Sequence, residues 1–248
     1  MKTGIIGLPQ VGKTSLFRIL TGAKVEGRST PNQAHIGIAK VPDPRVLALA
    51  VVYFGAVATN YGISFWLPQI IKDFGNLSNL QIGMITAIPY AIGLVGMVWW
   101  SRRSDEKFER KGHAAIALAV AGIFIGLSTV FDNPVPKMAC LSIAGFGVFA
   151  VLPIFWTLPT AFLSGAAAAA GIAMINALGN LAGFIGPYAM GWIKDATGSF
   201  SGGLLFIAAC GLVAMIIVIL LPHEEHVATA EMEHLPEYGE HGIQAPEL

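Results

Sequence analysis

The sequence is poor in charged residues. Asp, Glu, Lys and Arg make up only 12% of its 248 residues, whereas roughly a quarter of the residues in a soluble domain are charged. Hydrophobic residues make up 54%, and the mean hydropathy is +0.66. A soluble core of this length cannot bury so much apolar surface. The composition therefore excludes an ordinary soluble protein and indicates a protein of the lipid bilayer.

The sequence also has no net charge, no cysteine pair suited to a disulfide and no regularly spaced set of metal-binding residues. The formal net charge is +0, so we expect no nucleic-acid partner. Cys140 and Cys210 both lie in apolar runs, where buried thiols are expected rather than a disulfide. The acidic C-terminal segment holds four irregularly spaced histidines, His223, His226, His234 and His241. We predict a disordered tail over residues 223–248, no metal site and no cofactor.

Charged residues divide the rest of the chain into stretches of membrane-spanning length. A helix needs roughly 20 apolar residues to cross the hydrocarbon core. Apolar stretches end near residues 72, 102, 132 and 194, and the long stretch over 138–193 divides near Ser164. The spacing predicts an all-α membrane domain of six spanning helices over residues 46–222.

Lys and Arg set the predicted orientation of these helices. Between the predicted helices, the segment 102–113 is the one strongly basic loop, with Arg102, Arg103, Lys107, Arg110 and Lys111. Basic loops lie on the cytoplasmic side of a membrane. We therefore predict a multi-pass protein of the inner (plasma) membrane with both termini in the cytoplasm.

A different pattern precedes the helices. Residues 7–14 read Gly-Leu-Pro-Gln-Val-Gly-Lys-Thr between a short apolar run and a helix-like segment. This matches the phosphate-binding loop G-x-x-x-x-G-K-[ST], in which Gly7 and Gly12 expose backbone N–H groups, Lys13 reaches the phosphates and Thr14 holds Mg²⁺. Together with Val-Pro-Asp-Pro-Arg at 41–45, the segment resembles the start of the YchF-type P-loop GTPase/ATPase family.

The resemblance to that nucleotide-binding family covers only residues 1–45. An N-K-x-D base-recognition motif is absent, and the D-x-x-G at 195–198 closes a predicted membrane helix. A fragment of this size lacks the partner strands that would bury its strand. We interpret it as a vestigial P-loop fragment from a gene fusion and predict that the chain is not an enzyme. A membrane-attached GTP- or ATP-binding protein is the alternative.

The membrane region resembles a second family. The motifs Asn-Tyr-Gly-Ile-Ser-Phe-Trp-Leu-Pro-Gln at 60–69, Ser-Asp-Glu-Lys-Phe-Glu-Arg-Lys-Gly-His at 104–113 and Asn-Ala-Leu-Gly-Asn at 176–180 are similar to the anion:cation symporters of the major facilitator superfamily. The resemblance implies a transporter of small organic acids, usually coupled to H⁺. Its members have twelve helices in two halves, and this chain resembles only the second half.

Uncharged polar and aromatic side chains within the predicted helices are the candidate substrate site: Asn60, Tyr61, Trp156, Thr157, Asn176 and Asn180. Such groups normally face the bundle or a watery cavity. They suit the hydroxyls and carboxylates of a small organic acid. Interhelical hydrogen bonding remains the alternative for the asparagines, and aromatic packing remains the alternative for Trp156 and Tyr61.

Asp, Glu, His, Arg and Lys are absent from the predicted helices. Proton coupling needs a titratable group, and an anion site usually needs a cation. In the family that this region resembles, such charges lie mainly in the first half. We therefore predict that the polypeptide alone neither couples to H⁺ nor alternates access, and that its partner is either a separate N-terminal half or a second copy in a homodimer.

Overall fold

The computed structural model describes residues 43–163 and 165–221, and the side chains of 165–167 are outside the description. Every regular element in these ranges is a helix. The helices are α2 (Pro44–Lys72), α3 (Asn79–Lys107), α4 (Lys111–Ser128), α5 (Pro134–Phe155), α6 (Thr157–Thr160), α7 (Gly165–Asn180), α8 (Ala182–Thr197) and α9 (Ser201–Leu220). The predicted phosphate loop and the predicted acidic tail lie outside the described residues.

The helices form six candidate membrane spans, as predicted. α5 and α6 together make one span over Pro134–Thr160, and α7 and α8 together make another over Ala168–Thr197. The other four spans are single helices. The chain is thus an all-helical, multi-pass membrane protein over its described part.

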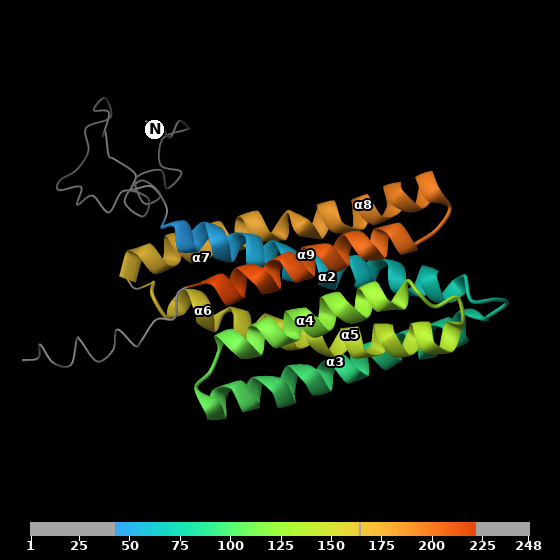
Figure 1. Cartoon of the computed structure of the whole chain (residues 1–248), viewed down its shortest axis with the longest axis horizontal. Helices are drawn as coiled ribbons and strands as arrows, with labels where there is room; N and C mark the ends of the chain where they lie inside the picture. The colour runs from blue at the N-terminus through green and yellow to red at the C-terminus, as the bar shows by residue number, and fades with distance from the viewer. Residues whose placement is uncertain (1–42, 164, 222–248) are drawn as a thin grey trace, which may run out of the picture.

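The spans run side by side along the long axis of the bundle, with α3 at one edge and α7–α8 at the other (Figure 1). α5 packs against α3 and α4, whereas α2 packs against α7, α8 and α9. α4 and α9 pack on each other and join the two sets. The first three spans are α2, α3 and α4, and the last three are α5–α6, α7–α8 and α9. The two groups interlock, because α2 packs among helices of the last three spans and α5 packs against helices of the first three.

Glycines allow the two central helices to approach their neighbours. A Cβ atom at Gly55 of α2 would lie 2.5 Å from the carbonyl oxygen of Cys210 in α9. A Cβ atom at Gly147 of α5 would likewise overlap the carbonyl oxygen of Ala117 in α4. Close contact between helix backbones is a common way for membrane helices to associate. The first helix of each group of three spans thus has a glycine where it crosses a helix of the other group: α2 at α9, and α5 at α4.

The predicted loop 102–113 is mostly helical, which corrects the expectation that the spanning helices hold no Asp, Glu, His, Arg or Lys. α3 continues to Lys107, and the left-handed conformation of Phe108 (φ 52°) ends it. α4 begins at Lys111 and contains the buried His113. At the other side of the bundle, α8 includes Lys194 and Asp195. Charge marks the ends of spans, but a capped helix can continue through charged residues beyond the membrane.

Candidate functional site

Two of the six spans are interrupted, and predicted site residues lie at both interruptions. α5 stops at Phe155, Trp156 is a turn, and α6 starts at Thr157. Pro159 has no N–H to donate to the carbonyl of Phe155, so the helical hydrogen bonding fails at this point. Helix breaks inside membrane proteins free backbone groups and often line binding sites.

The second interruption falls between Asn180 and Ala182. The side-chain Nδ2 of Asn180 donates to the main-chain oxygen of Asn176 at 2.8 Å and to its Oδ1 at 2.7 Å. A side chain that bonds the backbone in this way competes with the regular helical ladder. The break lies near the middle of the span Ala168–Thr197, at the depth where transporters hold their substrates.

Tyr53 of α2 connects the two interruptions. Its ring stacks on Phe155 with centroids 5.0 Å apart and meets Trp156 edge-on at 4.8 Å. Its side chain also interacts with that of Asn180. Gly179 leaves space for the ring, because a Cβ atom there would overlap it. We call Tyr53, Trp156, Asn176 and Asn180 the aromatic–amide site.

Tyr53 was not among the predicted site residues. It lies seven positions before Asn60 in the sequence, a spacing that puts both residues on the same face of a helix. That periodicity was the available indication in the sequence. Its pairing with Asn180 depends on how α2 crosses α7, which no pattern within α2 specifies.

The two asparagines of the site are exposed. An amide that faces hydrocarbon without partners is costly, and polar groups in membrane spans normally face a partner helix or a water-filled cavity. Asn176 and Asn180 make some of their hydrogen bonds with each other. Their remaining amide donors and acceptors lie on the exposed surface of the bundle. This face is therefore suited to a ligand, to water or to another protein surface rather than to lipid.

Trp156 and Thr157 are both half-buried. The Thr157 hydroxyl donates to the main-chain oxygen of Ile154 at 2.7 Å, so its one proton is used across the break, on the last turn of α5. No described residue accepts a hydrogen bond from the Trp156 indole N–H. Trp156 is therefore better placed than Thr157 to donate to a ligand.

Asn60 and Tyr61 are neighbours in the sequence but face different helices. Asn60 lines a small cavity between α2, α3 and α5, together with Ser64, Tyr90 and Phe149. Tyr61 points toward α8, next to Gly183. Of the six predicted residues, the aromatic–amide site thus contains Trp156, Asn176 and Asn180. Thr157 follows Trp156 at the first break, and Asn60 and Tyr61 face other neighbours.

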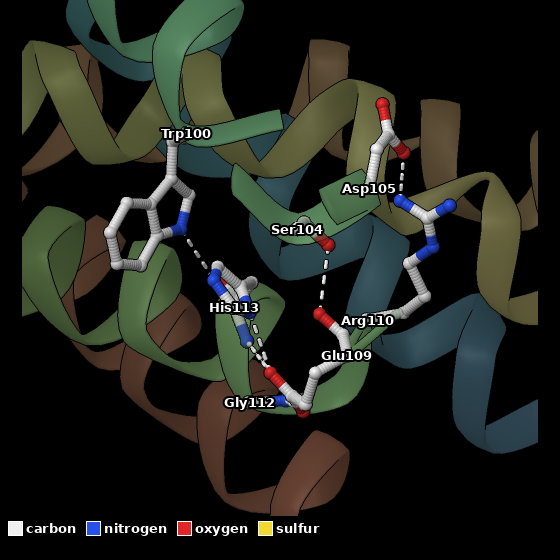
Figure 2. Close-up of polar contacts among 7 residues, drawn as sticks. All are labelled: Trp100, Ser104, Asp105, Glu109, Arg110, Gly112 and His113. Atoms are coloured by element: carbon white, nitrogen blue, oxygen red, sulfur yellow. Dashed lines mark hydrogen bonds and ion pairs between the residues drawn. The ribbon is translucent and has the colours of Figure 1, made fainter. Parts of the chain in front are cut away.

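A charged network ties α3 to α4 at the end of the bundle that carries residues 108–110, which we call the basic end (Figure 2). Glu109 Oε2 lies 2.6 Å from His113 Nδ1, and the carboxylate accepts backbone hydrogen bonds from Gly112 and His113. The Trp100 indole donates to the main-chain oxygen of His113 at 2.9 Å. These bonds cap the first turn of α4 and attach it to α3.

Two further contacts complete this network. Ser104 donates to the main-chain oxygen of Glu109 at 2.8 Å, and Arg110 pairs with Asp105. Partial burial alone raises the pKa of Glu109, but the hydrogen bonds from Gly112 and His113 outweigh it and hold that pKa below its ordinary value. Glu109 is therefore a carboxylate at neutral pH. Within the described ranges, no cluster of three His, Cys, Asp or Glu side chains is suited to hold a metal ion.

Comparison with known proteins identifies the family. A family model described as Major Facilitator Superfamily matches residues 49–238, which include most of α2 and all of the later spans. The chain belongs to the major facilitator superfamily. Interlocked groups of three helices are the arrangement within each half of proteins of this superfamily. Membership confirms the prediction that the chain is not an enzyme.

The relatives are named as transporters. A putative tartrate transporter of Agrobacterium vitis is 46% identical over 203 residues, which cover 80% of this chain and 44% of the relative. A quinolone resistance transporter of Acinetobacter baumannii is 40% identical over 72% of this chain and 41% of the relative. The inner membrane transport protein RhmT of Escherichia coli is 37% identical over 77% and 44%. The chain spans less than half the length of these relatives.

Proposed function

We propose that the chain is one six-helix half of a transporter for small organic anions and that the aromatic–amide site is its share of the substrate site. The observation that carries the proposal is the exposed pair Asn176–Asn180 at a helix break near mid-membrane. Amide groups donate to carboxylate oxygens and accept from hydroxyls. Hydroxylated organic acids such as tartrate, after which one relative is named, present both kinds of group.

The anionic charge of such a substrate is met by a second protein unit in this proposal. The aromatic–amide site contains no cation, and a carboxylate in a membrane needs one nearby. The window of α3 that best fits a membrane is only 17% buried, and the same holds for α7–α8. A second six-helix unit, either a separate N-terminal half or another copy of this chain, would cover these helices. A separate N-terminal half would also supply the titratable group for coupling to H⁺, whereas another copy of this chain would bring the same uncharged membrane stretches.

The proposed location is the inner membrane, with the basic end in the cytoplasm. The support is the cluster of Arg and Lys at that end. Phe108 and Val130, at opposite ends, are 81% and 72% exposed. With Cys140 and Cys210 replaced by serine, Phe108→Cys should react with a membrane-impermeant maleimide only in inverted vesicles, and Val130→Cys only in intact cells. The reverse pattern would overturn the orientation.

Transport is tested by co-expressing this chain with the first half of the Agrobacterium vitis relative. We expect uptake of labelled tartrate that neither half supports alone. Asn180→Ala should reduce uptake on the order of tenfold or more, because the lost amide leaves substrate groups unpaired. Tyr188→Phe, which changes an exposed tyrosine of α8, is the control. If the pair takes up no hydroxylated organic acid the function is wrong, and unchanged uptake by Asn180→Ala means that the site is wrong.

The phosphate-loop motif supports a second candidate function, nucleotide binding. The support is the sequence Gly7–Thr14 itself. Binding of ATP or GTP by the purified chain, abolished by Lys13→Ala, would establish it. Equal retention of nucleotide by the two proteins, or no retention by either, would leave the motif as a vestige.

A further inference from the structure

Three turns meet at the end of the bundle opposite the basic end, namely those between α2 and α3, between α4 and α5, and between α8 and α9 (Figure 1). A cavity of about 280 Å³ lies at this end. Its lining comes from the end of α2, from the α4–α5 turn and the start of α5, and from the α8–α9 turn and the start of α9. The volume is far more than one water molecule needs and is close to that of a small ligand pocket.

The floor of this cavity is the core of the six-helix unit itself. Ile70 of α2 and Phe200 before α9 line it and are only 3% and 7% exposed. Both belong to a cluster of buried residues from α2, α4, α5, α8 and α9. The described residues that line the cavity include none from α3, α7 or α8. The cavity therefore does not depend on what covers α3 and α7–α8.

Charges of both signs surround the cavity without pairing. Asp73, Asp132 and Lys137 line it, and none of them forms an ion pair with a residue in the described part of the chain. Lys137 is half-buried, and an ammonium removed from water is costly unless it is paired. Lys194 stands beside the cavity, 4.1 Å from the centre of the Phe200 ring. Two carboxylates and two ammonium groups thus balance around one space.

The lining also offers a hydroxyl donor and apolar surface. The Ser199 hydroxyl donates to Ser201 Oγ at 3.2 Å, which leaves the Ser201 proton without an acceptor among the residues described. Phe74 adds a half-buried ring to the apolar floor. A ligand would thus meet acceptors, donors and an apolar face in the same cavity.

We propose that this cavity binds a small zwitterion, an amino acid with an apolar side chain. Its ammonium pairs with Asp73 and Asp132. Its carboxylate accepts from Lys137 and Ser201, and its side chain lies on the apolar floor. Charge complementarity selects this occupant, because a simple anion would leave the two carboxylates unpaired and a metal cation would leave Lys137 unpaired. The site is separate from the aromatic–amide site and does not rest on the proposed function.

The test uses the purified full-length chain in nanodiscs and three probes of similar shape. These are leucine, isocaproate, which lacks the ammonium of leucine, and isoamylamine, which lacks its carboxylate. Binding is measured by isothermal titration calorimetry at neutral pH, with empty nanodiscs as the blank. We expect leucine to bind at least about tenfold more tightly than either analogue, because each analogue loses charge-assisted hydrogen bonds.

Charge-removing variants then assign the two ends of the ligand. Lys137→Gln should abolish the advantage of leucine over isoamylamine, and Asp132→Asn should reduce its advantage over isocaproate. Lys72→Gln and Asp195→Asn are the matched controls, because they change exposed residues at the same end that do not line the cavity. Each control should change the affinity for leucine by less than about twofold.

Several results would overturn the proposal. Leucine could fail to bind, or it could bind no more tightly than one of its analogues. Tightest binding of isocaproate would indicate a site for simple anions, and displacement of leucine by micromolar Ca²⁺ would indicate a metal site. Equal losses in the variants and their controls would place binding outside the cavity. The three probes are compared on the unaltered chain, so this comparison decides the matter even where a variant fails to fold.

Discussion

α2 and α3 are alike in every property that predicts a membrane span, yet they occupy opposite kinds of position. Each has 29 residues, and their mean hydropathies are 1.7 and 1.8. In the best membrane-spanning window, 67% of α2 is buried and only 17% of α3. Hydropathy therefore tells which segments cross a bilayer, but not which of them lie at the centre of the bundle.

The distribution of small residues separates the two helices. α2 is surrounded by α7, α8 and α9 and places Gly55 and Gly62 against α9. α3 has Gly93 and Gly96 on one side only, against Phe149 and Phe146 of α5. The rest of its surface carries large exposed side chains. A helix becomes central when small residues on several faces admit neighbours.

The largest expected effect comes from filling a glycine contact. Gly55→Leu should destabilise the bundle by about 3 kcal/mol or more, because the new side chain overlaps the Cys210 carbonyl and Ala214. A Cβ atom at Gly83 of α3 would meet no atom within 4 Å, so Gly83→Leu should change stability by less than about 0.5 kcal/mol. Thermal unfolding in detergent, followed by circular dichroism, measures both. Equal losses would mean that burial in the bundle does not distinguish the helices.

A smaller effect is expected from matched tryptophans. Trp66 of α2 donates its indole N–H to the main-chain oxygen of Pro187 at 3.0 Å, whereas Trp99 of α3 is half exposed. Trp66→Phe should cost about 1–2 kcal/mol for the lost hydrogen bond and the space left behind. Trp99→Phe should cost less than about 0.5 kcal/mol. The same unfolding assay applies, and a larger loss at Trp99 would contradict the assignment of α3 to the periphery.

The sequence predicted the spans better than the site. Low charge and apolar length were enough for six helices, because the bilayer imposes that length on any spanning segment. The sequence could not predict that Tyr53 would connect Trp156 with Asn180, since this contact depends on helix breaks and on the crossing of α2 with α7. Asn60 carries the same polar signature as Asn180 but faces α3 and α5. Polarity identifies candidate residues, and only packing groups them.

Charges at helix ends were misjudged for a related reason. A charged residue was taken as the end of a helix, but α3 continues through Arg102 to Lys107. Once outside the hydrocarbon, a helix ends where its backbone groups find other partners. Here α3 ends at Phe108, whose N–H donates to the main-chain oxygen of Asp105, and the cap from Glu109 then starts α4; neither is marked by hydropathy.

The smallest expected effect concerns the way in which the peripheral helix is held at its basic end. α3 packs mainly against α5, so the bonds from Glu109 to α4 should give it a second attachment at this end. Glu109→Gln should cost about 0.5–1 kcal/mol at neutral pH, a modest value because its side chain is 41% exposed and screened by water. Asp43→Asn, which changes the N-cap of the central helix α2, is the matched variant.

The pH dependence of this loss follows from the sign of the shift. The pKa of Glu109 is lower in the folded protein than its ordinary value of 4.5, so the stabilisation is complete above that value and is lost as the pH falls through the folded pKa. Unfolding temperatures of wild type and Glu109→Gln should therefore differ at about pH 7 and converge toward about pH 3. The pKa of Asp43 is lowered too, chiefly by its hydrogen bond from Arg45, so Asp43→Asn should converge in the same direction. A constant difference for Glu109→Gln across this range would show that its carboxylate charge does not hold α3 to α4.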